Sequence, residues 1–222
     1  MITGAAGNLG RAVAGAFASA GASMILMDRD EEGLRSAYGG EDERRRLVSA
    51  DLLDAASVAR AVAASTRIDV LCNIAGGFRM GQPVHETSEE TWNLMFDLNA
   101  KSVINTARAV VPRMLSAGYG KIVNIAALAG LGGKAYMGAY IASKSAVIRL
   151  TESMSAELRD RGINVNCILP STIDTPQNRA DMPKSDPAAW VAPSELAAVM
   201  MFLGSEGASA VTGALTPVAG RV

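Results

Sequence analysis

Cysteine and histidine are scarce in this chain of 222 residues, which contains two cysteines and one histidine. Cys72 and Cys167 each lie in an apolar run, so we expect two buried thiols rather than a disulfide. His85 lies in a polar stretch, and no cluster of metal-ligating residues surrounds it, so we expect no metal site. Such cysteine usage is typical of a reducing compartment, and we expect a cytoplasmic protein.

The sequence also lacks a long hydrophobic run and an excess of charge of one sign. The longest apolar runs, such as residues 196–203, are too short to cross a bilayer, and no export signal opens the chain. The 21 basic and 22 acidic residues are interspersed, without the basic stripe that binding to a phosphate backbone requires. Membranes and nucleic acids are therefore not expected partners.

Short apolar runs rich in β-branched residues alternate with longer segments of helical periodicity. This alternation is typical of βαβ units around a parallel sheet. The sequence therefore predicts an α/β fold, a single doubly wound Rossmann-type domain with a parallel sheet over residues 1–222. The predicted strands are Ser23–Met27, Leu47–Ala50, Ile68–Cys72, Lys121–Ala126, Ile163–Leu169 and Ala214–Val218.

Helices are predicted from apolar spacing and from signals at their ends. Residues 9–20 place an apolar stripe on one face and end before Gly21. A capping-box pattern of Thr87 with Glu90 begins a helix that runs to Ser116 and is kinked at Pro112. Further helices are expected over residues 140–161 and from residue 195, the last of them capped by Ser194.

A glycine-rich turn, TGAAGNLG, opens the chain and leads into the first predicted helix. Gly4 allows a tight turn, Gly7 allows close approach of a ligand, and Gly10 allows close helix packing. The helix start at Asn8 and Leu9 can then face a pyrophosphate, although a glycine triplet alone is weak evidence. Because only three residues precede the turn, where strands usually have ~5–6, we expect a truncated first strand and a truncated or misassigned N-terminus.

A carboxylate ends the next predicted strand, at Asp28, which follows Gly10 by 18 residues. This is close to the spacing at which an acidic side chain accepts hydrogen bonds from the adenosine ribose of a dinucleotide. Its charge would repel a 2′-phosphate, which favours NAD(H), whereas the adjacent Arg29 keeps NADP(H) possible. Asp51 and Leu52, after the following strand, are expected near the adenine, although Asp51 can equally begin a helix.

Tyr140 and Lys144 lie four residues apart in the run MGAYIASKSAV, which places them on the same face of a helix. A neighbouring ammonium lowers the pKa of a phenol, as general acid–base catalysis near neutral pH requires. Taken alone, this spacing is more often an ordinary solvated helix face. Together with the glycine turn and Asp28, it indicates a nicotinamide-dependent oxidoreductase.

These motifs resemble the short-chain dehydrogenase/reductase family over essentially the whole chain. The segment Asn73-Ile74-Ala75-Gly76 is similar to the family's Asn-Asn-Ala-Gly loop, and the run PSTIDT at residues 170–175 is similar to its Pro-Gly-x-Val/Ile-x-Thr motif. The resemblance implies cofactor contacts from Asn73, Ala75, Gly76, Lys144, Pro170, Ile173 and Thr175.

The resemblance also assigns the catalytic roles. It implies that Tyr140 is the general acid, that Lys144 holds the ribose and depresses the phenol pKa, and that Asn99 anchors a water near Lys144. It further implies a homodimer or homotetramer, because family members pair the helices that start here near Thr87 and Gly138. The apolar faces of these helices can equally pack onto the sheet.

One position departs from the family pattern. The substrate-orienting serine lies 13 residues before the tyrosine, and this position is Ala127 here. Losing a donor that stabilises developing charge can cost ~10²–10³ in turnover, and Ser143 is not expected to replace it. One branch of the family, the quinonoid dihydropteridine reductases, also has alanine there, and its segment after the sixth strand resembles DTPQNRADMPKSDPAAW.

That segment predicts a substrate lid over about residues 176–193, with Gln177 and Trp190 as substrate contacts. Trp190 can equally pack on the lid's own core. We expect hydride transfer to a small carbonyl or quinonoid, pterin-like substrate. Two alternatives stay open: a 3-oxoacyl thioester or alcohol/sugar dehydrogenase of the same family, and a non-catalytic NAD-binding sensor or scaffold.

Overall fold

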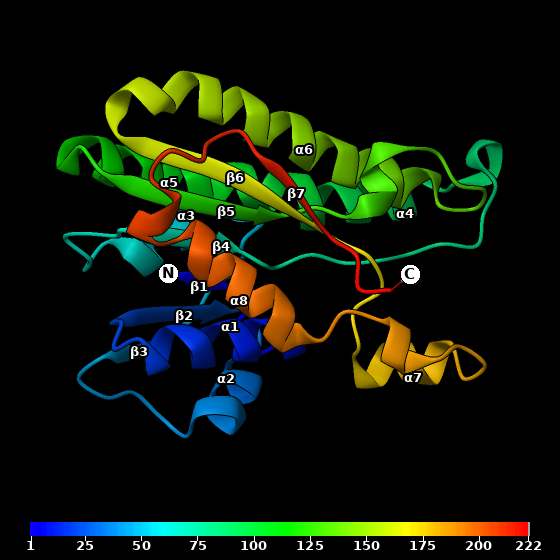
Figure 1. Cartoon of the computed structure of the whole chain (residues 1–222), viewed down its shortest axis with the longest axis horizontal. Coiled ribbons are helices and arrows are strands. Elements are labelled where there is room, and N and C mark those ends of the chain that lie inside the picture. Colours follow the sequence, from blue (N-terminus) through cyan, green and yellow to red (C-terminus); the bar gives the residue numbers. More distant parts are fainter. Residues whose placement is uncertain (222) are drawn as a thin grey trace.

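A seven-stranded parallel sheet forms the middle layer of the fold in the computed structural model, which describes residues 1–221 (Figure 1). Its strands are β1 (Ile2–Thr3), β2 (Met24–Asp28), β3 (Arg45–Ser49), β4 (Val70–Asn73), β5 (Gly120–Ile125), β6 (Ile163–Pro170) and β7 (Leu215–Val218), in the order β3-β2-β1-β4-β5-β6-β7. The six strands predicted from the sequence are all present, with ends shifted by at most two residues.

Helices cover both faces of this sheet, as the doubly wound prediction requires. One face carries α1 (Asn8–Ser19), α2 (Glu31–Tyr38) and α8 (Pro193–Leu203), and the other carries α3 (Ala55–Val62), α5 (Ser102–Ala117) and α6 (Gly138–Leu158). The strand pleat explains the division, because neighbouring side chains point to opposite faces. Leu26 packs under α1 and α8, whereas the next residue, Met27, packs under α3 and α5.

The segment predicted as one helix from Thr87 to Ser116 is broken in the structure. It contains α4 (Glu89–Phe96), a π-helical turn over Asp97–Lys101, and then α5. The interruption therefore falls at the π turn rather than at Pro112, which lies inside the continuous α5.

Two predicted helix caps are wrong. Ser88, rather than Thr87, caps α4 and accepts a hydrogen bond from Thr91 N at 3.1 Å, whereas the Thr87 hydroxyl donates to a backbone carbonyl. In α8 the cap position belongs to Ala192 rather than Ser194, because a proline follows it and suits the first helical position. Glu195 Oε2 accepts from Ala192 N at 2.8 Å.

Buried free thiols are present where they were predicted. Cys72 and Cys167 lie on β4 and β6, and neither forms a disulfide. Separately, none of the helices described within residues 1–221 is long and apolar enough to cross a membrane.

Candidate active site

The candidate site lies at the carboxyl ends of β1 and β4, where the strand order changes direction. Ligands of open α/β sheets bind at such a switch point. The glycine turn follows β1 and leads into α1, whose N-terminus no side chain within residues 1–221 caps. The first amides of α1, at Asn8 and Leu9, are therefore available to an anionic group.

The three glycines of the turn meet different constraints. Gly4 has φ +65°, and a Cβ there would lie 2.8 Å from Ala75 N. A Cβ on Gly10 would lie 2.1 Å from Gly4 O, so helix packing excludes any side chain. A Cβ on Gly7 would meet only Gly4 O, at 3.3 Å. Close contacts within the protein exclude a side chain at Gly4 and Gly10. At Gly7 the protein leaves more room, so close approach of a ligand is the stronger reason for a glycine there.

Asp28 is held beside this turn by the backbone. Its Oδ2 accepts a hydrogen bond from Ala6 N at 3.0 Å, and its Oδ1 accepts from Asp30 N at 3.2 Å. The carboxylate is half-buried, whereas the side chain of Arg29 is exposed. The structure therefore brings Asp28 to the cradle that the glycines form.

Asp51 and Leu52 lie just beyond β3. Asp51 is exposed, and its Oδ1 accepts from Leu53 N at 2.8 Å, while Asp54 rather than Asp51 caps α3. Leu52 O accepts from Asn105 Nδ2 at 2.8 Å, which ties this loop to α5. The helix-starting alternative for Asp51 is therefore wrong.

The loop after β4 is held by a buried polar network. Asn73 donates from Nδ2 to Asn124 Oδ1 at 2.9 Å and accepts from the Thr106 hydroxyl at 2.9 Å. Asn124 in turn donates to Thr151 Oγ1 at 2.9 Å. The side chain of Asn73 thus links β4 and β5 to α5 and faces the protein interior, so only its backbone is free to meet a cofactor.

Asn99 lies in the π turn, a distortion that is frequent at functional sites. Its Oδ1 accepts from Gly77 N at 2.9 Å, and its Nδ2 donates to Gly77 O at 3.1 Å and to Ser143 Oγ at 2.9 Å. A Cβ on Gly76 would lie 2.7 Å from Asn99 Oδ1 and 3.3 Å from Lys144 Nζ. Asn99, Lys144 and the loop glycines therefore converge on one point.

The two titratable groups on α6 respond to burial in opposite directions. Burial lowers the pKa of Lys144 to about 8, and its ammonium donates to Ile125 O at 3.0 Å. Burial raises the pKa of Tyr140 to about 12. The expected lowering of the phenol pKa is therefore not present in the protein alone, because burial outweighs any effect of Lys144. Tyr140 holds its proton at neutral pH.

Ala127 is buried at the end of β5. Ser143 is also buried, and its hydroxyl donates to Tyr140 O at 2.7 Å while accepting from Asn99. Both functions of that hydroxyl are thus used to hold the backbone and Asn99. Ser143 does not supply the donor that Ala127 lacks, in agreement with the sequence-based expectation.

The predicted lid contains α7 (Pro176–Asp181) and is closed at its base by a β-bridge between Ile173 and Val191. Thr175 Oγ1 caps α7 by accepting from Asn178 N at 3.1 Å. Gln177 is exposed, and its Nε2 donates to Asp181 Oδ1 at 2.8 Å. Trp190 is only 8% exposed, as its packing role requires.

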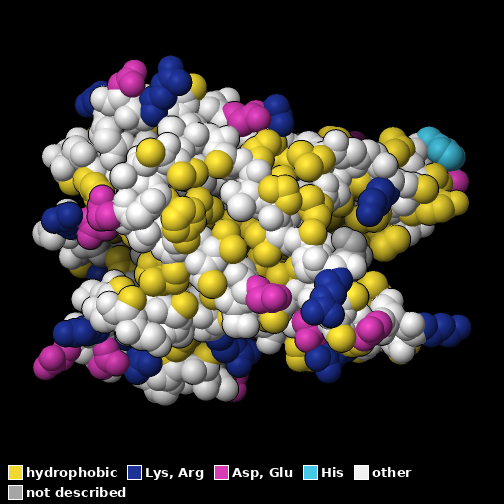
Figure 2. All heavy atoms as spheres, in the orientation of Figure 1, with side chains coloured by type: hydrophobic (Ala, Val, Ile, Leu, Met, Phe, Trp, Pro, Cys, Tyr) yellow, Lys and Arg dark blue, Asp and Glu magenta, His cyan; other side chains and the backbone are white. Residues whose placement is uncertain are grey.

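The lid stands apart from the layers of the fold. In Figure 1 α7 projects below the end of the sheet, opposite the segment that leads into α4. Pro170 ends β6 at the base of this projection and is buried. Figure 2 shows the same side of the molecule divided into two lobes with a cleft between them.

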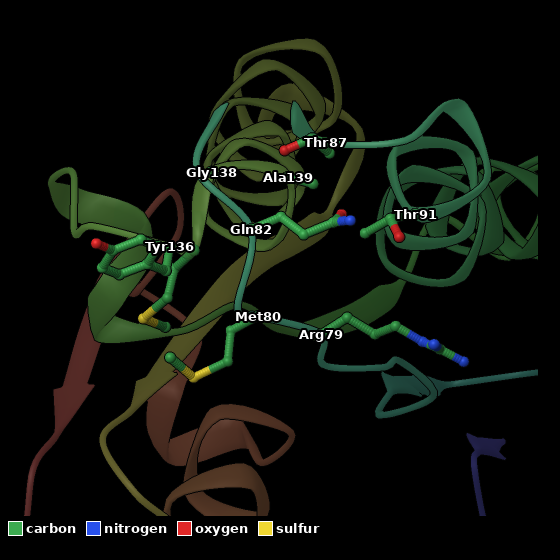
Figure 3. A pocket seen from close by; sticks show the side chains of 9 residues that line it. Arg79, Met80, Gln82, Thr87, Thr91, Tyr136, Gly138 and Ala139 are labelled. Atoms are coloured by element: carbon green, nitrogen blue, oxygen red, sulfur yellow. The ribbon is translucent and has the colours of Figure 1, made fainter. Parts of the chain in front are cut away.

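A pocket of about 210 Å³ adjoins the first turn of α6 (Figure 3). Polar and apolar residues from the loop after β4, from α4 and from the segment that leads into α6 line it, among them Arg79, Met80, Gln82, Thr87, Thr91 and Tyr136. Figure 3 shows Gln82 pointing toward Thr91, with Met80 and Tyr136 on the other side. A larger cavity of about 610 Å³ lies around Met1 and Val70, at the opposite end of β4 from the site.

The sequence did not reveal the roles of two residues of the site. Ser143 holds Asn99, and its only signal was its position three residues after Tyr140. Phe78 packs its ring against that of Tyr140, with centroids 4.8 Å apart, and only its place two residues after Gly76 pointed to it. Both contacts join segments that are distant in sequence.

Comparison with known proteins shows the family. Residues 1–186 match the family model described as short chain dehydrogenase. The chain is 36% identical over 230 residues to D-threitol dehydrogenase of Mycolicibacterium smegmatis, an alignment that covers 96% of this chain and 88% of that protein.

Solved structures agree with this match over nearly the whole fold. A 3-oxoacyl-[acyl-carrier protein] reductase with bound NAD from Brucella melitensis superposes with a TM-score of 0.88 at 31% identity, covering 100% of this chain and 89% of that one. ElxO with NADP bound superposes with a TM-score of 0.89 at 25% identity, covering 99% and 96%. The chain belongs to the short-chain dehydrogenase family and is an NAD(P)-dependent oxidoreductase.

Proposed function

We propose that this enzyme transfers hydride between NAD(H) and a small carbonyl or quinonoid substrate, with Tyr140 as the general acid. One observation carries the proposal: Tyr140 lies one helical turn before Lys144 on α6, and Lys144 Nζ and Asn99 Oδ1 both lie beside Gly76. An acid that keeps its proton at neutral pH can protonate the oxygen of a reduced carbonyl.

The residues at the switch point fit a dinucleotide. The start of α1, which no side chain within residues 1–221 caps, and the glycine turn form a cradle, and a Cβ on Gly7 would meet only Gly4 O beside it. Gly4, Gly7, Asn8, Leu9 and Gly10 would hold the pyrophosphate, Asp28 and Arg29 the adenosine ribose, Asp51 and Leu52 the adenine, and Asn73, Ala75, Gly76, Lys144, Pro170, Ile173 and Thr175 the nicotinamide end. When bound, the cofactor supplies or accepts the hydride.

Three side chains take part in proton transfer. Tyr140 donates it to the substrate oxygen. Lys144, with a pKa of about 8, keeps most of its charge at neutral pH and can bind a ribose hydroxyl. Asn99 Oδ1 uses one lone pair on Gly77 N, which leaves the other for a water beside Lys144. Such a water would return a proton to the tyrosine.

Two observations favour different substrate classes. Ala127 offers no hydroxyl to a carbonyl oxygen, which favours an activated acceptor such as a quinonoid, pterin-like ring. The D-threitol and 3-oxoacyl relatives favour an alcohol, sugar or 3-oxoacyl substrate instead. Tyr140, Lys144 and Asn99 are all in place, which argues against a non-catalytic sensor. Gln177 and Trp190 remain candidate substrate contacts, the latter only if the lid rearranges.

NADH oxidation with a panel of acceptors tests this function. The panel comprises quinonoid dihydropterin, a quinone, a 3-oxoacyl thioester and a ketose. Oxidation with any of them supports the enzyme, and the preferred acceptor identifies the substrate class. Binding of NADH without oxidation by any acceptor would support the sensor.

NADH is expected to bind at least several-fold more tightly than NADPH, because Asp28 would meet the 2′-phosphate with like charge. Fluorescence titration with both cofactors measures the ratio. Asp28→Ala should bring the two affinities together, whereas Asp30→Ala, the removal of a nearby exposed carboxylate, should leave the preference in place. Equal affinities in the unaltered protein would show that Arg29 controls the site.

Ala127→Ser is expected to raise activity on simple ketones more than on an activated quinonoid acceptor. The added hydroxyl would supply a donor where negative charge develops, worth ~1–3 kcal/mol if its geometry is right. Steady-state rates with one acceptor of each kind measure the difference. A variant that favours neither acceptor would contradict this account of Ala127.

The enzyme is expected to form a homodimer or homotetramer in solution. Trp92 on α4 and Ile104 on α5 are 44% and 37% exposed, so the helices that are expected to pair present apolar side chains to solvent in the single chain. Light scattering at micromolar concentration should give at least twice the chain mass of 23.0 kDa. A particle with the mass of one chain would reject the assembly.

We infer a reducing, cytoplasmic location from the cysteines. Burial raises the pKa of Cys72 to about 12 and that of Cys167 to about 11, so both are thiols at neutral pH. Free thiols of this kind are usual where the compartment is reducing.

A further inference from the structure

Phe78 is an unusual residue beside the proposed acid. Its side chain is 54% exposed, yet its ring packs edge-to-face on the ring of Tyr140, with centroids 4.8 Å apart and an interplanar angle of 84°. One part of the ring thus supports the phenol, and the rest is open to solvent. An aromatic ring that both touches the acid and faces outward is placed to meet whatever the acid protonates.

The position of Phe78 is fixed by the catalytic machinery itself. Asn99 bonds to both the N–H and the C=O of Gly77, the residue before Phe78. A Cβ on Gly77 would lie 2.8 Å from Leu98 Cδ1, so the π turn packs closely on this loop. Farther along, Gly81 N donates to Tyr136 O at 2.8 Å. The ring is therefore presented by a loop that is anchored on both sides.

The loop that carries Phe78 and the segment before α6 expose further apolar side chains, beside polar residues such as Arg79 and Gln82. Met80 in the same loop is 58% exposed, and Leu131 and Tyr136, which precede α6, are 56% and 55% exposed. Figure 3 shows Met80 and Tyr136 on the same side of the pocket. Ala127, at the end of β5, adds no hydroxyl. Exposed apolar side chains gathered near a site commonly mark a ligand-binding surface.

We propose that Phe78 determines substrate specificity by contacting an apolar, ring-shaped carbon skeleton next to the reacting carbonyl. This inference rests on the proposed function, because it needs Tyr140 to act on the substrate oxygen. That oxygen must lie about 2.6–3.2 Å from the phenol hydroxyl. With the ring centroids of Tyr140 and Phe78 4.8 Å apart, the adjoining carbons would then be within reach of the Phe78 ring. The Phe78 ring itself offers no hydrogen-bond partner to hydroxyl groups of a sugar chain that lose water against it.

The test compares two acceptors, cyclohexane-1,2-dione and the open-chain ketose xylulose, in NADH oxidation. We expect the dione to have the higher kcat/KM. Phe78→Ala should lower kcat/KM for the dione by roughly tenfold, chiefly through KM, and change that for xylulose less than twofold. Phe78→Leu, which keeps an apolar surface, should recover most of the loss.

Two controls distinguish an effect on substrate specificity from a general structural effect of the substitution. Phe202→Ala removes the same side chain from α8, where it is 51% exposed, and should alter neither acceptor. NADH affinity should be unchanged in all variants. Equal losses of kcat with both acceptors, or a preference of the unaltered enzyme for xylulose, would overturn the specificity role and leave hydride transfer standing. No oxidation with either acceptor or with the wider panel would overturn the proposed function as well.

Discussion

Tyr140→Phe should reduce turnover by at least ~10²-fold, the range in which general acids contribute, and leave NADH affinity within about twofold. Phenylalanine keeps the ring that packs against Phe78 and removes only the hydroxyl that carries the proton. The loss should therefore appear in kcat, as expected for an interaction made in the transition state. Steady-state rates with the best acceptor, and fluorescence titration of NADH, measure the two quantities.

Tyr119→Phe is the matched control for this variant. The hydroxyl of Tyr119 donates to Glu206 Oε1 at 2.6 Å, just before β5 begins and away from the carboxyl ends of the strands. Its removal should leave turnover unchanged. Full activity in Tyr140→Phe would remove the general-acid assignment, and a weakened affinity for NADH would show that the phenol holds the cofactor instead.

Gly10→Ala should weaken NADH binding at least roughly tenfold and lower the melting temperature. The new Cβ would lie 2.1 Å from Gly4 O and 2.7 Å from Ala5 Cα, and neither backbone atom can rotate away. Either α1 or the glycine turn must move, and overpacking of this kind costs ~1–3 kcal/mol. Both changes move the amides that are proposed to hold the pyrophosphate. Fluorescence titration and a thermal melt report the two effects separately.

Gly15→Ala provides the control in the same helix. A Cβ on Gly15 would meet no atom within 4 Å, so only the helix propensity changes. Alanine is favoured over glycine inside a helix by ~0.5–1 kcal/mol, and the melting temperature should rise while NADH affinity stays the same. If Gly10→Ala behaved like Gly15→Ala, close packing of α1 on the turn would not be what positions the cofactor.

The strands could be predicted because their signal is local. β5 and β6 are buried almost throughout, so they read as continuous apolar runs between turns. The break between α4 and α5 could not be predicted in this way, because apolar spacing continues through residues 97–101 while the backbone widens to a π turn. That turn is stabilised by Asn99, whose partners lie on Gly77 and Ser143, far away in the sequence.

The candidate site likewise has features that sequence spacing predicts and features that depend on long-range contacts. The glycine turn and Asp28 could be assigned to the site from the sequence because each lies at the end of a predicted strand. Tyr140 and Lys144 could be assigned because their spacing places them on one face of a helix. The pKa of Tyr140 could not be predicted from the sequence, since it depends on how deeply the folded chain buries the phenol. Asn73 was expected at the cofactor from its motif, yet hydrogen bonds to Asn124 and Thr106 turn its side chain inward. Such pairings exist only after the strands assemble.

The base of the lid is fastened to residues 219–221. Arg221 N donates to Ala189 O at 2.9 Å, and Ser171 Oγ donates to Ala219 O at 2.7 Å. Gly220, at φ +64°, packs where a Cβ would touch Ala189 O. Residues 219–221 are themselves half-buried or exposed, so they can detach from the lid base as one local unit at a small fraction of the global unfolding free energy, while the buried Val191 keeps that base packed on the core. Exchange of ligands at the cleft would then require only this partial opening, while the sheet stays folded.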